Sequence, residues 1–183
     1  MARIGPDDSE LDEAEQMAQR SDDVRTGWSQ TIEDMRAMAE NRREAGYEAL
    51  TLQAGNTAPI APEQGESADW GLFHVIPGDD AEAFRDLVQR ADFEETGVYQ
   101  ASIGRDTFLV TECIDHDAEL VLLIAGSYTR EAAPELVRAA MDRGRLYTHV
   151  KTLDGTILGT IEHDDPAAFF PDPDAIFAYE HGE

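Results

Sequence analysis

The order of the expected strands and helices constrains the fold of this 183-residue chain most, because that order repeats. From residue 70 to residue 114 the apolar pattern predicts a strand, a helix and two strands that form a hairpin. From residue 119 to residue 163 it predicts the same four elements, with Asp154-Gly155 as the turn of the second hairpin. The pattern therefore predicts an α+β fold with a mostly antiparallel sheet and two helices.

The two halves also match in sequence when they are shifted so that Leu87-Val88 falls on Leu136-Val137. The same shift aligns further residues without a gap: Ala91 with Ala140, Thr107 with Thr156, Leu109 with Leu158, Thr111 with Thr160 and Asp115 with Asp164. Matches this sparse can arise by chance, so the argument depends on the shared element order. We expect a duplicated strand-helix-strand-strand unit, with both helices on one face of a shared sheet.

A helical segment precedes this domain. Apolar residues, among them Trp28, recur every three or four positions between Leu11 and Ala39, which is the spacing of one helix face. Gly27 and the polar stretch Ser21-Asp22-Asp23 weaken the middle of the pattern, so we expect two helices or one kinked helix, ending near Gly46. The apolar face is expected to pack on the sheet domain, or else to form the seam of a homodimer.

These patterns divide the chain into an N-terminal helical segment (1–46), an α+β sheet domain (47–165) and a C-terminal tail (166–183). Residues 54–68 are rich in Pro, Gly and small polar residues, so we expect a loop there. The tail holds four aromatic residues among three prolines. It either packs back on the domain or offers a docking segment to a partner.

The charge of the chain indicates where the protein works rather than what it does. Thirty-nine acidic residues stand against 14 basic ones, which gives a net charge of −25, and Lys151 is the only lysine. Acids this numerous could form a patch for a basic partner, or a solvated surface adapted to concentrated salt. They are spread singly and in pairs, without the run of five or six that is typical of an acidic tail. This dispersion and the shortage of lysine favour the second interpretation.

The composition resembles that of proteins from extremely halophilic archaea. With stretches such as Gly46 to Leu52 (GYEALTL), most of the chain resembles an uncharacterised family of small acidic proteins from those organisms, a domain of unknown function. That resemblance implies no known activity, cofactor or site residue.

Several classes of function are disfavoured. No stripe of Lys and Arg is present to bind a nucleic-acid backbone. The longest apolar run, Leu120 to Ala125, is too short to span a membrane, and the N-terminus lacks the apolar core of a signal peptide, so we expect a cytoplasmic protein. Cys113 is alone, which excludes a disulfide framework, and its apolar strand predicts an inert core thiol. No nucleotide-binding or nucleophile motif is present, and we expect no cofactor.

The first candidate site is a metal pair. His74 and Glu112 lie in expected strands, where alternation could point both to one sheet face. The element order resembles that of metal-dependent glyoxalase-type modules and of duplicated small-molecule-binding regulators, and glyoxalase-like modules use ligands of these types. The second half has Leu123 and Ile161 at the matching positions, so half of such a ligand set would be missing. A partly buried His74, bonded within the sheet, is the simpler interpretation.

The other histidines give weaker signals. His116 and His163 stand beside acidic residues, and a carboxylate beside an imidazole could bind a divalent metal ion. Both histidines are expected at exposed strand ends, however, and in so acidic a chain most histidines have an acidic neighbour.

The second candidate site is a ligand-binding face. Tyr147, His149 and Lys151 alternate along an expected strand, so their side chains share one face, and Tyr99 on an earlier strand could join them. The set could bind an anionic or aromatic ligand, or it could lie beneath the N-terminal helical segment, which we favour.

We therefore expect a non-enzymatic cytoplasmic protein that binds a small ligand or a protein partner, as an adaptor or regulator. The alternative is a metal-dependent enzyme of glyoxalase-like topology with a single metal near His74 and Glu112. Neither interpretation involves nucleic acid or a membrane.

Overall fold

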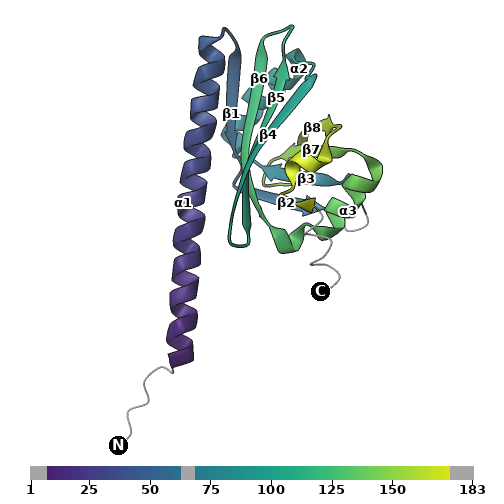
Figure 1. Cartoon of the computed structure of the whole chain (residues 1–183). Helices are drawn as coiled ribbons and strands as arrows, with labels where there is room; N and C mark the ends of the chain where they lie inside the picture. The colour runs from purple at the N-terminus through teal and green to yellow at the C-terminus, as the bar shows by residue number, and fades with distance from the viewer. Residues whose placement is uncertain (1–7, 63–68, 174–183) are drawn as a thin grey trace, which may run out of the picture.

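The structure, a computed structural model, describes residues 8–62 and 69–173 of the chain. The described elements, in chain order, are α1 (Asp8–Glu44), β1 (Glu48–Gln53), β2 (Asn56–Ile60), β3 (Gly71–Val75), the short turn of 3₁₀ helix η1 (Gly78–Asp80), α2 (Ala81–Arg90), β4 (Glu95–Ile103), β5 (Asp106–Asp115), β6 (Leu120–Thr129), η2 (Arg130–Ala132), α3 (Pro134–Arg143), β7 (Leu146–Lys151), β8 (Ile157–His163) and η3 (Pro166–Phe169) (Figure 1).

The strands form two sheets of four. Sheet A has the order β1-β6-β5-β4, and sheet B has the order β2-β3-β7-β8. β1 pairs with β6 and β3 with β7 in parallel, and the other neighbours are antiparallel. The α+β fold with mostly antiparallel pairing is thus confirmed. The expectation of one shared sheet with both helices on one face is wrong, because the strands divide between two sheets.

The two halves share an element order but not a strand arrangement. Both read strand, helix, strand, strand: β3-α2-β4-β5 and then β6-α3-β7-β8. Each half contributes its first strand to one sheet and its hairpin to the other. However, β6 lies beside the second strand of the first hairpin, whereas β3 lies beside the first strand of the second hairpin. The halves therefore do not form two equivalent units, and the strand arrangement does not support the expected duplication.

Sheet A is covered on both faces. Every residue of β5 and most residues of β6 are buried, as expected for the strand that begins near residue 119. α1 packs on one face through Ile32 and Met35, against Val110 and Val121. The opposite face packs against sheet B and α2, and Cys113 lies there, where burial raises the pKa of its thiol to about 12. The expectation of an inert core thiol is confirmed.

Gly126 of β6 lets the two sheets approach closely. A Cβ at this position would lie 2.4 Å from Thr57 Oγ1 and 2.9 Å from the His74 ring, and both residues belong to sheet B. No larger residue fits here without moving β2 or β3, so this glycine sets the spacing of the layers.

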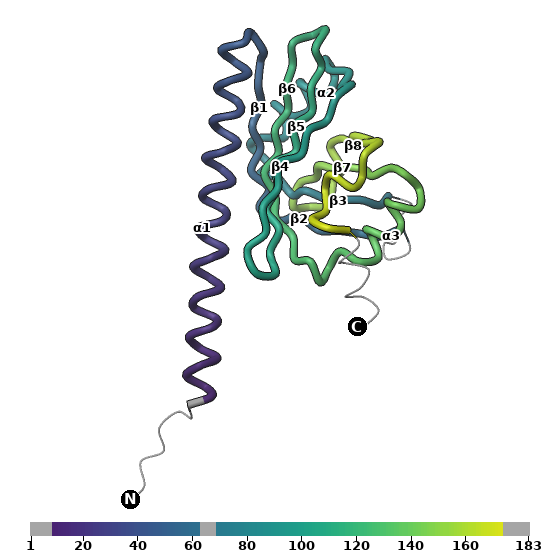
Figure 2. The backbone as a smooth tube through the Cα atoms, in the orientation of Figure 1, coloured from purple at the N-terminus to yellow at the C-terminus, as the bar shows by residue number. Residues whose placement is uncertain are grey.

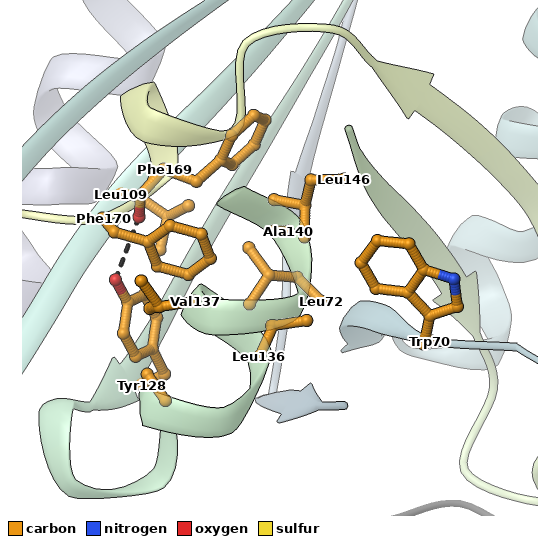
Figure 3. Packing of buried hydrophobic residues seen from close by; sticks show 11 residues of the cluster. Trp70, Leu72, Leu109, Tyr128, Leu136, Val137, Ala140, Leu146, Phe169 and Phe170 are labelled. Carbon is orange, nitrogen blue, oxygen red and sulfur yellow. Dashed lines mark hydrogen bonds between the residues drawn. The ribbon is translucent and has the colours of Figure 1, made fainter. Parts of the chain in front are cut away.

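The described part of the tail packs back on the domain. Phe169 and Phe170 are buried against α3, and the Tyr128 hydroxyl donates a hydrogen bond to the Phe169 carbonyl oxygen at 2.9 Å (Figure 3). This confirms the first of the two expectations for residues 166–173. Residues 174–183 lie outside the described residues.

The expected loop over residues 54–68 is described only up to residue 62. This part is not all loop, because it contains β2, an edge strand in which Pro59 is tolerated.

α1 is one continuous helix of 37 residues, neither divided nor kinked. Gly27 does not interrupt it but brings it close to sheet A: a Cβ there would lie 2.5 Å from Phe108 Cε2 and 3.0 Å from Ile103 Cδ1. The glycine that suggested a break is therefore a packing position. No helix in residues 8–62 and 69–173 combines the length and apolar character needed to cross a membrane.

The first prediction tests this packing position. Gly27→Ala should lower the free energy of unfolding by about 1–3 kcal/mol, because the added methyl group displaces the buried Phe108 ring. This loss should exceed the gain of about 1 kcal/mol that alanine normally brings to a helix. Chemical denaturation in concentrated KCl gives the measurement. Ala37→Gly on the exposed side of the same helix is the control for helix propensity, and a more stable Gly27→Ala variant would contradict the packing role.

Candidate interaction surface

α1 has a packed half and a projecting half. From Val24 onward the helix lies on sheet A, whereas every residue from Ser9 to Asp22 is exposed. Figure 2 shows this part of α1 running past the end of the sheets. We call residues 9–22 the arm, which at 1.5 Å per residue is about 21 Å long.

The arm receives little support from the rest of the described structure. An isolated helix of about 14 residues is marginal in water, because most helical stability comes from packing of an apolar face. Leu11 and Met17 instead expose 47% and 72% of their surface. The Gln19 side-chain amide donates to Asp23 at 3.0 Å, which is a local bond within the helix. The arm is thus an extension whose apolar side chains remain uncovered.

A groove lies where the arm leaves sheet A, beside the β4–β5 turn. Its apolar lining comes from Met17, Val24 and Trp28 on α1, and Trp28 is half-buried. Its polar lining includes five charged side chains, those of Glu13, Arg20, Arg25, Arg105 and Asp106. The groove therefore offers apolar contact and ionic contact side by side.

Arginines are concentrated at this groove relative to the rest of the chain. Three of the 14 basic residues line it. Arg20 lies 3.6 Å from Asp106, and Arg105 lies 3.2 Å from Glu131. Asp106 is buried, but both arginines are about half exposed, so each keeps donor groups that can bind another anion.

The opposite end of α1 is held by an ion pair. Arg42 donates two hydrogen bonds of 3.0 Å to the Glu112 carboxylate, which is 3% exposed, and this contact raises the pKa of the guanidinium. A bidentate pair of this kind restrains both side chains. Glu112 is therefore engaged in anchoring α1 to β5.

The structure does not bring His74 and Glu112 together. They belong to different sheets, and His74 bonds to Thr57 at 2.9 Å instead. Among the described residues, no three His, Cys, Asp or Glu side chains are grouped in a way that could hold a metal ion.

Three buried histidines lie in sheet B, and two of them contact sheet A. His163 was expected at an exposed end but is buried, because its Nδ1 bonds to Thr96 of sheet A at 2.9 Å and its Nε2 to Thr148 at 2.7 Å. His74 packs against Gly126 of sheet A. Burial lowers the pKa of His74 to about 3 and that of His163 to about 4, and it also lowers the pKa of His149. The sheet junction is thus built with uncharged imidazoles.

His116 lies outside this group. It is exposed, and its ring nitrogens contact the Tyr47 hydroxyl at 2.8 Å and the Glu95 carboxylate. It ties the β5–β6 turn to neighbouring elements.

Tyr147, His149 and Lys151 share one face of β7, as the alternation predicts. His149 stacks on Phe73 with ring centroids 4.3 Å apart, and Lys151 Nζ lies 5.4 Å from the centre of the same ring. His149 is buried, and its Nε2–H donates to the Trp70 carbonyl at 2.7 Å while Nδ1 accepts from a threonine hydroxyl. Its polar atoms are therefore already engaged.

Tyr99 does not join this set. It lies on β4 in sheet A, pairs with Val110 and is 54% exposed on the side of α1. The expectation that α1 covers the Tyr147 face is wrong as well, since α1 packs on sheet A.

The sequence did not predict the arm or its groove. The polar residues Ser21 to Asp23 were the available signal, because they interrupt the apolar stripe of α1 close to the point where the helix leaves sheet A.

The second prediction concerns pH. An unfolded histidine has a pKa of about 6.5, above the folded values of about 3 for His74 and about 4 for His163. Between these values the unfolded chain binds more protons, so the stability due to the uncharged rings is complete above about pH 6.5 and falls as pH decreases. Melting temperatures at constant KCl should therefore fall between pH 7 and about pH 5.5, where most carboxylates stay ionised. His163→Gln should reduce this dependence, whereas exposed His116→Gln should preserve it.

No curated protein and no solved structure matches the chain. The model of the DUF7529 family, a family of unknown function, matches residues 14–171, which include most of α1 and both sheets. The chain therefore belongs to the DUF7529 family.

Proposed function

We propose that the protein is a non-enzymatic cytoplasmic interaction module, an adaptor or regulator, that binds a protein partner through the arm and the adjoining groove. The observation that carries this proposal is the exposure of every side chain from Ser9 to Asp22 on a helix that continues beyond its sheet. A helix extended in this way gains stability when another surface covers its apolar residues.

Two further observations favour a protein over a small molecule. The groove is lined by residues 13–28 of α1 and by Arg105 and Asp106 at the hairpin turn, and a lining spread along a helix suits an elongated segment. The alternative ligand face on β7 is filled by contacts of Tyr147, His149 and Lys151 with Trp70 and Phe73.

We also propose that the protein is adapted to concentrated salt, like the halophilic archaeal proteins that its composition resembles. The net charge of −25 lies far beyond the magnitude of about 2–8 that suits a small domain. In about 1 M salt the Debye length falls to about 3 Å, which removes most of the repulsion among dispersed carboxylates.

The third prediction tests the arm as a contact surface. Replacing Met17 with the photo-crosslinking residue p-benzoylphenylalanine should give specific adducts with a protein upon illumination of living cells. The same replacement at Leu153, which is 91% exposed on the β7–β8 turn, is the matched control and should give none above background. Electrophoresis and mass spectrometry of the adducts give the readout. Equal labelling from the two positions, or none from position 17, would remove the support for this proposal.

The fourth prediction concerns salt. The melting temperature should decrease steeply as KCl falls below about 1 M, because screening of the carboxylates is then lost. Calorimetry across a KCl series, with a chloride-free potassium salt in parallel, separates screening by the cation from anion effects. A melting temperature that stays constant from dilute to concentrated salt would disprove the haloadaptive interpretation.

A further inference from the structure

We infer that the partner of the arm is a second copy of this chain, bound antiparallel, so that the arm of each copy enters the groove of the other. This inference rests on the proposed function and names its partner. It follows from the distribution of charge along α1, the spacing of its apolar residues and the place of the sheets at one end of the helix.

The charge distribution along α1 is self-complementary in the antiparallel direction. Between Glu10 and Glu15 the arm carries only acidic charges, whereas three of the five charged residues that line the groove are arginines. The other two are Glu13 and Asp106, and Asp106 is paired with Arg20. In an antiparallel pair the acidic start of each arm lies over the arginines of the other copy, and both contacts form twice. A parallel pair would instead place the acidic starts side by side.

The apolar and small residues of the exposed stripe follow the same rule. Leu11, Ala14, Ala18, Ser21 and Trp28 fall on alternating intervals of three and four residues, the repeat of a helix-pair seam, in which Arg25 occupies the remaining position. Antiparallel pairing sets Leu11 opposite Trp28, Ala14 opposite Arg25 and Ala18 opposite Ser21 of the other copy. Small residues at the centre allow the two backbones to approach closely. The exposed Leu11 then covers the outer part of the partly buried Trp28 in the groove.

The position of the sheets favours the same arrangement. Both sheets lie beside the C-terminal part of α1, and the arm extends away from them (Figures 1 and 2). Antiparallel arms hold the two acidic sheet domains at opposite ends of the pair, whereas parallel arms would press them together. Because each copy carries a net charge of −25, we expect the pair to be weak in dilute buffer and stronger in salt, where only charges in contact still interact.

The experiment uses two charge reversals on the full chain, Glu13→Arg and Arg25→Glu, which change exposed residues. In the antiparallel pair residue 13 of each copy lies beside residue 25 of the other. Each variant alone should self-associate roughly three- to tenfold more weakly than the unchanged protein, because both contacts become repulsive. A mixture of the two variants should associate about as well as the unchanged protein, because both contacts are again attractive. Sedimentation velocity in about 1 M KCl measures all of these affinities.

Recovery in the mixture supports the antiparallel pair, since parallel arms would not place these residues together. The inference is overturned if the unchanged protein is monomeric up to its solubility limit, or if the mixture is no stronger than each variant alone. Equal melting temperatures of both variants and the unchanged protein exclude a folding defect as the cause. A monomer that still crosslinks a different protein from position 17 would overturn this inference and leave the proposed function intact. A monomer without such crosslinks would contradict both.

Discussion

The packing of α1 on the outer face of sheet A is the contact on which the other features depend. It closes the apolar face of β5 and β6, so both central strands are buried on each side. It is fixed by the missing side chain at Gly27 and by the Arg42–Glu112 ion pair. Because these restraints act on residues 24–44 alone, the remainder of the helix is held in direction without being covered. The arm is a consequence of this anchoring.

The spacing of the two sheets depends on a second close contact. Gly126 admits Thr57 and His74, and His163 reaches Thr96 across the junction. Although the chain carries many carboxylates, burial keeps the rings of His74 and His163 uncharged at this junction. Surface charge and interior polarity are therefore separate features of this protein.

Local features could be predicted from the sequence, and nonlocal ones could not. Both hairpins, the helices and the burial of β6 follow from periodicity and turn residues such as Asp154-Gly155. The division into two sheets depends on which strands pair across long distances, and a repeated element order carries no such information. A glycine within a helical pattern looks the same in the sequence whether it interrupts the helix or allows the helix to pack closely on a neighbour, as Gly27 does. The candidate pair of His74 and Glu112 was wrongly grouped for a similar reason. Alternation along a strand gives the face to which a side chain points, but not the sheet to which the strand belongs, and these two residues lie in different sheets.

The parallel pairing of β1 with β6 has a consequence for synthesis on the ribosome. Glu48 pairs with Leu120, and α1 packs on β5 and β6 as well as on β1, so the first helix and strand emerge long before most of the surface on which they pack. Until β6 has left the exit tunnel, most of the apolar face of α1 and the open edge of β1 have nothing to cover them. During this interval the hydrated carboxylates that flank the stripe on α1 are the groups that keep the unfinished chain in solution.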